Sequence, residues 1–213
     1  MIDLYCERLG PGLLAEPINA ASNLAFFIAA WKSWLLIKDR ESIGYEGFLL
    51  VGLIITIGIG STLFHSYATN WAKQLDIIPI LLFQLCFVWF YILKVIELNY
   101  SKTAIIVIAL FTASHLTRQF PHLLNGSLIY APAFCVIITL AIVHYYQKKN
   151  NPTLLISATA IFALSLFFRT IDNAICSYLT IGSHFLWHIL NGVLIYLVMK
   201  ALFTNWPAQR HLS

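Results

Sequence analysis

Three histidines, one serine and one aspartate in this sequence have the residue types and the spacing of a hydrolytic site. Ser61 and His65 lie four residues apart, and Asp76 follows His65 by eleven residues. His184 and His188 are again four residues apart, near the end of the chain. Side chains with this spacing lie on one face of a helix. Each pair can therefore project toward a common site.

The chemistry that these residues could perform is metal-assisted hydrolysis. Three imidazoles that leave a fourth position open to water form a common catalytic zinc site. Zinc lowers the pKa of its water toward neutrality. Asp76 could then handle the proton of that water, and Ser61 could donate a hydrogen bond to a developing oxyanion. The alternative is that each histidine only forms an interhelical hydrogen bond, the commoner role of a single histidine in a membrane helix.

The composition shows what kind of element must position these side chains. Hydrophobic residues make up 60% of the 213 residues and charged residues only 10%, whereas about one quarter of a soluble domain is charged. A soluble domain, a disordered chain and a nucleic-acid-binding arm are therefore excluded, and four cysteines are too few for a small disulfide scaffold of this length. The sequence indicates an integral, multi-pass membrane protein.

Seven segments reach or approach the roughly 20 apolar residues of a transmembrane helix. They are residues 17–37, 46–65, 74–94, 103–118, 127–146, 153–172 and 182–203, of which 103–118 is the shortest. Backbone polar groups within lipid must be satisfied inside their own segment, so each span should be a helix. We predict an all-α, seven-transmembrane bundle that forms a single domain over residues 1–213.

The basic residues predict the orientation of this bundle. One side holds Lys32, Lys38, Arg40, Lys94, Lys102, Lys148, Lys149, Lys200 and Arg210, and the other holds Arg8, Lys73, Arg118 and Arg169. Cytoplasmic loops carry the excess of basic residues, so we expect the N-terminus outside or in a lumen and the C-terminus in the cytoplasm. The three histidines and Asp76 then fall at one depth near the outer leaflet, which favours a metal site.

Three acids lie in the first sixteen residues, at Asp3, Glu7 and Glu16. Together with backbone carbonyls they could bind calcium, which prefers oxygen ligands. Alternatively they form a solvated acidic tail in which Glu16 favours the dipole at a helix N-terminus. On the residues alone the second interpretation is favoured.

Two other pairs allow more than one interpretation. Cys6 and Cys176 both fall on the predicted outer side, where an oxidising compartment would permit a disulfide. Arg169 and Asp172 are three residues apart near the end of a span. An ion pair on one helix face is the favoured interpretation of these two, and the alternative is that Asp172 supports a metal-binding histidine from behind.

The motifs together resemble those of the alkaline ceramidases, seven-span zinc amidases grouped with the progestin/adiponectin-receptor-like membrane hydrolases. The matching segments are Asp3-Leu-Tyr-Cys-Glu7, Ala15-Glu-Pro-Ile-Asn-Ala-Ala-Ser-Asn-Leu24, Gly60-Ser-Thr-Leu-Phe-His65, Gln74-Leu-Asp76, Arg169-Thr-Ile-Asp-Asn173 and His184-Phe-Leu-Trp-His188. They extend from the N-terminus to the last span. The spacing of the early acids differs from the family pattern.

The resemblance implies a role for each residue that matches a motif. It implies that His65, His184 and His188 hold zinc, that Asp76 handles the proton and that Ser61 steadies the oxyanion. It also implies that Asp3, Glu7 and Glu16 are candidates for calcium and that Cys6 is bonded to Cys176. The expected activity is hydrolysis of the amide of an N-acyl lipid, most simply ceramide, to a fatty acid and a long-chain base.

Two other functions fit the same residues. The chain could hydrolyse a different N-acyl lipid or a lipid ester with the same chemistry. It could instead be a non-enzymatic lipid receptor in which zinc only braces the helices. Ser61 and Asp76 argue against the receptor, because a bracing site has no need of an acid beside an open coordination position.

Overall fold

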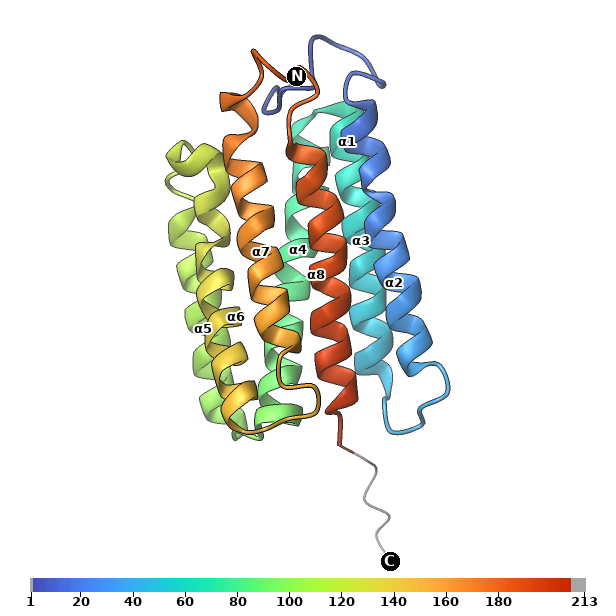
Figure 1. Cartoon of the computed structure of the whole chain (residues 1–213), viewed down its shortest axis with the longest axis vertical. Coiled ribbons are helices and arrows are strands. Elements are labelled where there is room, and N and C mark those ends of the chain that lie inside the picture. Colours follow the sequence, from blue (N-terminus) through green and yellow to red (C-terminus); the bar gives the residue numbers. More distant parts are fainter. Residues whose placement is uncertain (1, 208–213) are drawn as a thin grey trace, which may run out of the picture.

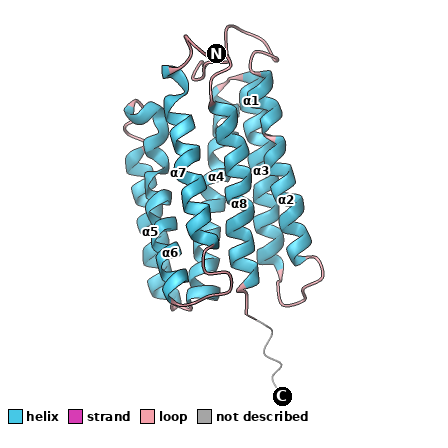
Figure 2. Cartoon of the chain, viewed as in Figure 1, coloured by secondary structure: helices cyan, strands magenta, loops and turns pink. Residues whose placement is uncertain are grey.

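The computed structural model describes residues 2–207, and within that range the chain is a bundle of long helices without strands (Figure 1; Figure 2). The helices are α1 (Pro17–Ser22), α2 (Leu24–Ile37), α3 (Tyr45–Tyr67), α4 (Asn70–Tyr91), α5 (Tyr100–Thr117), α6 (Ala131–Tyr146), α7 (Leu154–Ile171) and α8 (His184–Thr204). A π-helical turn at Ile92–Ile96 follows α4, and 3₁₀ turns lie at Leu123–Tyr130 and Asp172–Ala174. The predicted all-α class is confirmed.

Six helical segments are long and apolar enough to cross a membrane. They are Pro17–Ile37, Tyr45–Tyr67, Asn70–Ile96, Leu123–Tyr146, Leu154–Ala174 and His184–Thr204. The predicted span 103–118 also forms a helix, α5, but it is not among these six. Its 18 residues rise about 27 Å, slightly less than the hydrocarbon thickness of a bilayer. Helix α5 packs against α6 within the bundle (Figure 1).

The N-terminal segment and the end of α8 lie at opposite ends of the bundle (Figure 1). An odd number of membrane crossings requires this arrangement, so it agrees with seven spans. One of the basic residues that predict the orientation, Arg210, lies outside the described residues. Which end faces the cytoplasm remains a prediction.

The first helix is tied to the segment that precedes it. Helix α1 begins at Pro17, whose fixed φ and missing N–H suit the first helical position. The carboxylate of Glu7 accepts hydrogen bonds from the backbone N–H groups of Ile18, at 2.6 Å, and Asn19, at 2.8 Å. These two N–H groups have no partner inside the helix. Glu7 therefore fixes the N-terminal segment against the start of α1.

Two glycines allow helices to approach closely at the end of the bundle that holds the N-terminal segment. A Cβ atom at Gly60 in α3 would lie 1.9 Å from the backbone oxygen of Leu75 in α4. A Cβ atom at Gly192 in α8 would lie 2.7 Å from the Cβ atom of Ala25 in α2. Only residues without a side chain permit these contacts, which bring α3 against α4 and α8 against α2.

Candidate metal centre

Three histidine side chains converge at the end of the bundle that carries the N-terminal segment. His65 lies near the end of α3, and His184 and His188 lie in the first turns of α8. All three are buried, and the atoms that they offer as ligands lie within 4.8 Å of one another. Among residues 2–207 this is the one such group of histidine, cysteine or acidic side chains. The structure thus brings together the three histidines singled out by their spacing.

The geometry of these side chains fits zinc. Nε2 of His65 lies 3.2 Å from Nε2 of His188, and a tetrahedral zinc ion with bonds of 2.0–2.1 Å sets two nitrogen ligands about 3.3 Å apart. Nδ1 of His184 is buried without a hydrogen-bond partner, an arrangement that is costly for a polar atom. Three buried imidazoles, one of them with an unsatisfied nitrogen, could hold such an ion and leave a fourth position open.

Two of the imidazoles are oriented by a partner on their other nitrogen. Nδ1 of His65 lies 2.6 Å from a carboxylate oxygen of Glu16. Nδ1 of His188 lies 2.7 Å from the hydroxyl oxygen of Ser22. Partners of this kind fix the tautomer and the ring orientation of metal-binding histidines. Nε2 of both rings is therefore directed toward the centre of the cluster.

Tyr5, in the N-terminal segment, covers the third imidazole. Its ring stacks on that of His184, with the ring centroids 3.6 Å apart and an interplanar angle of 16°. Burial raises the pKa of Tyr5, although the nearby charge of Arg169 acts in the opposite direction. The phenol therefore stays neutral, and its ring shields the histidines from water.

Ser61 and Asp76 lie beside the three histidines. Ser61 is one turn before His65 in α3, and its hydroxyl oxygen lies 3.5 Å from Nε2 of His188. Asp76, in the second turn of α4, lies beside the side chain of Ser61 and within electrostatic range of His65. The close approach of α3 and α4 at the preceding glycine makes this contact possible. All five residues predicted for the hydrolytic site are thus neighbours.

An apolar cavity adjoins the cluster between the helices. It has a volume of about 90 Å³ and is lined mainly by hydrophobic side chains, among them Phe26, Ile57, Phe83, Leu110, Trp187 and Val198. The ring of Phe26 packs edge-on against His188, with centroids 6.1 Å apart. Trp187 is the sequence neighbour of His188. None of the three histidines lines the cavity, but its wall at Phe26 contacts His188, and α8 lines it from Trp187 to Val198.

Comparison with known families agrees with this site. The sequence model of the family described as Ceramidase matches residues 9–208, which is almost the whole chain. The chain belongs to the ceramidase family. Ceramidases act on the amide bond of a lipid, so membership implies a lipid amide hydrolase. A comparison with curated proteins finds no match.

The three N-terminal acids of this ceramidase-family chain have different sets of partners, although Glu7 and Glu16 both contact Asn19. Asp3 is exposed, and both oxygens of Glu7 accept backbone hydrogen bonds at the start of α1. Glu16 contacts His65 and also forms a buried ion pair with Arg8, at 2.5 Å. Burial alone would raise the pKa of Glu16, but hydrogen bonds with His65 and Arg8 and the charge of His65 lower it. Glu16 is therefore a charged partner of a histidine in the cluster.

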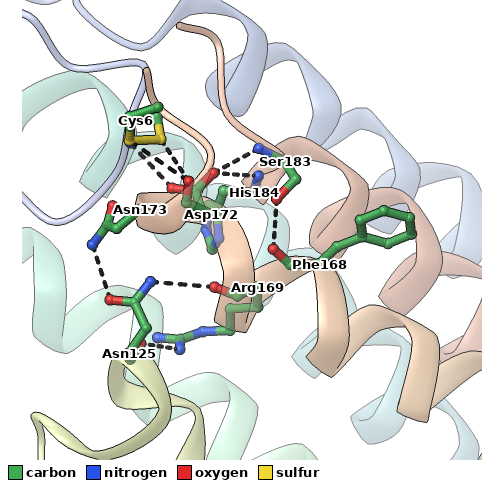
Figure 3. The surroundings of a disulfide bond; sticks show 9 residues. Cys6, Asn125, Phe168, Arg169, Asp172, Asn173, Ser183 and His184 are labelled. Carbon is green, nitrogen blue, oxygen red and sulfur yellow. Dashed lines mark hydrogen bonds between the residues drawn. A yellow bond between two sulfur atoms is a disulfide. The ribbon is translucent and has the colours of Figure 1, made fainter. Parts of the chain in front are cut away.

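The ion pair favoured for Arg169 and Asp172 is wrong. Asp172 instead accepts hydrogen bonds from the backbone N–H groups of Ser183, at 2.6 Å, and His184, at 2.9 Å. Two N–H groups at the start of α8 need an acceptor and attract this carboxylate. Arg169 turns away and donates to the backbone oxygen of Asn125, at 2.8 Å (Figure 3). Asp172 thus fixes the start of the helix that carries two histidines of the candidate metal centre.

A disulfide joins the N-terminal segment to the connection between α7 and α8. Cys6 is bonded to Cys176, as the family resemblance implies (Figure 3). The backbone N–H of Cys6 also donates to Asp172, at 3.1 Å. The disulfide therefore holds Tyr5 and Glu7 against the elements that carry the histidines.

Several residues around the centre gave no recognisable signal in the sequence. Ser22 lies in a segment that carries the family resemblance, but its contact with His188 is 166 residues away in the chain. Tyr5 and Arg8 occupy a polar N-terminal segment in which only the acids and the cysteine indicated a function. Their contacts depend on how that segment folds over α3 and α8, which residue spacing does not reveal.

Proposed function

We propose that this protein is a zinc-dependent intramembrane amidohydrolase that cleaves the N-acyl amide of ceramide or a similar lipid. The products would be a fatty acid and sphingosine or a related long-chain base. The observation that carries the proposal is the buried group of His65, His184 and His188 with Ser61 and Asp76 beside it. Membership of the ceramidase family supports the same class of reaction.

The residues around the cluster have the properties that amide hydrolysis requires. Zinc held by the three histidines would supply Lewis acidity and lower the pKa of a bound water. The hydroxyl of Ser61 can donate a hydrogen bond to the amide oxygen as that oxygen gains negative charge. The carboxylate of Asp76 can accept a proton from the attacking water and deliver it to the departing amine.

The apolar cavity supports a lipid substrate. Its side chains, including Phe26 and Trp187, can surround hydrocarbon chains while the amide carbonyl lies beside His188. Burying each methylene group contributes about 0.8 kcal/mol relative to water. Ceramide is almost insoluble in water, so we infer that it enters from the bilayer between helices.

We further infer that the metal centre lies near the outer or lumenal leaflet. Basic residues predict this orientation. The disulfide Cys6–Cys176 supports it, because disulfides persist in oxidising compartments and this one lies at the same end of the bundle as the histidines.

A substrate panel tests the proposed reaction. Purified protein loaded with zinc would be given a fluorescent ceramide, an N-acyl amino lipid and a lipid ester with the same acyl chain. We expect the release of fatty acid from ceramide to exceed that from the ester, to stop on chelation and to return when zinc is added back. If the zinc-loaded, folded protein released no fatty acid from any of these lipids, the result would favour a receptor with a structural metal.

A further inference from the structure

Arg8 is a buried cation that touches the metal centre through two different contacts. Its side chain is 1% exposed, and Nε lies 2.5 Å from Oε1 of Glu16. Nη2 donates a hydrogen bond to the backbone oxygen of His65, at 2.7 Å. The other carboxylate oxygen of Glu16 lies 2.6 Å from Nδ1 of His65. One guanidinium thus contacts both the backbone of this histidine and the acid that orients its ring.

The charge of Arg8 is needed because Glu16 is buried. A carboxylate away from water requires a nearby cation and hydrogen bonds, and removal of one partner of a buried pair leaves an uncompensated charge. The remaining acceptor positions of Glu16 are used by His65 and by the side-chain amide of Asn19, at 3.1 Å. Among these partners of Glu16, Arg8 carries a full positive charge that does not depend on the protonation of a histidine.

The same contacts do not fit the calcium site that the family resemblance implies for these acids. Calcium takes six to eight oxygen ligands. Both oxygens of Glu7 accept backbone N–H groups, both oxygens of Glu16 have N–H or imidazole partners, and Asp3 is exposed. The buried oxygens there without a partner are Oδ1 of Asn19 and Oδ1 of Asn23, which are fewer than the ligands that calcium takes. A calcium ion near Glu16 would also be repelled by the guanidinium of Arg8.

We propose that Arg8 is the resident cation of this site, where it takes the place of calcium and positions His65 through Glu16. The proposal rests on the proposed zinc centre. Arg8 is a positioning residue, since it acts on the histidine through a carboxylate and a backbone oxygen. Zinc binding by this chain is accordingly independent of calcium.

A calcium titration tests the proposal on the unaltered protein. Metal-free wild type would be loaded with zinc, and both its zinc affinity, measured by competition with a chelating dye, and its Tm would be followed as calcium is added. We expect neither quantity to change. A rise in zinc affinity or in Tm on addition of calcium would overturn the proposal.

Variants test whether Arg8 acts through Glu16. Arg8→Gln should lower zinc affinity about 10- to 100-fold, the usual effect of losing a residue that supports a metal ligand, and Arg8→Lys should restore part of it because the charge is kept. In a Glu16→Gln background, Arg8→Gln should cause little further loss. Wild-type zinc affinity in Arg8→Gln, or full additivity of the two changes, would contradict the proposal.

A matched control separates positioning from general stability. Arg40 also donates to a backbone oxygen, that of Phe203, but at the other end of the bundle. We expect Arg40→Gln to change Tm without changing zinc affinity. If wild type binds no zinc at all, the proposed function fails, whereas the response of Tm to calcium still decides which cation belongs beside Glu16.

Discussion

Two imidazoles of the candidate metal centre are oriented by partners on their other ring nitrogen. His65 is held by Glu16, and His188 is held by Ser22. Each of these contacts uses the ring nitrogen that faces away from the cluster, so the other nitrogen is left for a ligand bond. Buried, closely spaced histidines in this arrangement could hold a metal ion.

Asp76→Asn separates metal binding from catalysis. The amide can still accept a hydrogen bond but cannot take up a proton at neutral pH, so turnover should fall about 10²- to 10⁴-fold. Zinc content should not change, because Asp76 is not one of the three proposed ligands. Metal analysis and fatty-acid release on the same preparation check both expectations.

The control for this variant is Asp39→Asn. Asp39 is exposed and pairs with its neighbour Lys38, away from the centre. The Asp39→Asn variant should keep the zinc content and the turnover of wild type. Unchanged turnover in Asp76→Asn would remove Asp76 from the mechanism.

Residue spacing predicted the histidines but not the residues that orient them. His184 and His188 share a helix face because they are four residues apart, and the expected topology placed His65 at the same depth. The partner of His65 lies 49 residues away in the chain, so no local pattern indicates it. For Asp172 the local spacing predicted the wrong partner, Arg169. Its carboxylate instead accepts hydrogen bonds from backbone N–H groups at the start of α8.

The close contact between helices α3 and α4 lies directly beside the site. Gly60 is the residue just before Ser61, and α4 passes so near that a Cβ atom there would overlap the backbone of Leu75. The next residue of α4 is Asp76. The glycine thus determines how closely the serine and the aspartate can approach.

Gly60→Ala should separate these two helices. Overpacking costs about 1–3 kcal/mol, and here the clash is with backbone, which cannot move like a flexible side chain. We expect a lower Tm and a loss of turnover that is larger than the loss of zinc. Thermal unfolding in detergent, with activity measured on the same samples, checks this.

Gly52→Ala is the matched control in the same helix. A Cβ atom at Gly52 meets nothing within 4 Å, and alanine favours a helix over glycine by up to about 1 kcal/mol. Its Tm should equal or exceed that of wild type. If Gly60→Ala and Gly52→Ala had the same Tm and the same turnover, the close approach of α3 and α4 would not matter for stability or activity.

The positions of the helices were predictable because long apolar runs dominate the sequence. Six of the seven expected spans meet the length and composition of a membrane helix, and the shortest, 103–118, forms α5. The break near Asn23, which divides the first span into α1 and α2, was not predicted. It depends on buried contacts of this polar residue, such as its hydrogen bond to the backbone oxygen of Asn19, at 3.0 Å.

The whole molecule is asymmetric along the bundle axis. The candidate metal centre and the disulfide lie at one end of the bundle. The N-terminal segment is at this end, and the end of α8 is at the other (Figure 1). The disulfide closes a sequence separation of 170 residues and so ties nearly the whole chain into one unit. This asymmetry makes the orientation in the membrane decisive for where the reaction takes place.

Cysteine labelling tests the orientation. In a background with Cys86→Ser and Cys135→Ser, single cysteines would be introduced at exposed Leu14, at the metal end, and at exposed Lys148, at the other end. In sealed vesicles of known orientation, an impermeant maleimide should label Leu14→Cys from the outer or lumenal face and Lys148→Cys only from the cytoplasmic face. The reverse pattern would place the centre at the cytoplasmic leaflet.

The central claim, a zinc centre that hydrolyses a lipid amide, is tested most directly by metal content. Mass spectrometry would be applied to detergent-purified wild type, to the double variant His184→Ala/His188→Ala and to His115→Ala, which removes an exposed histidine outside the cluster. The same preparations would be assayed for fatty-acid release from a fluorescent ceramide.

We predict about one zinc ion per chain in wild type and in His115→Ala and none in the double variant. Release of fatty acid should follow zinc content and stop on chelation. Well-folded wild type that contains no zinc, or a double variant that keeps both zinc and activity, would contradict the account.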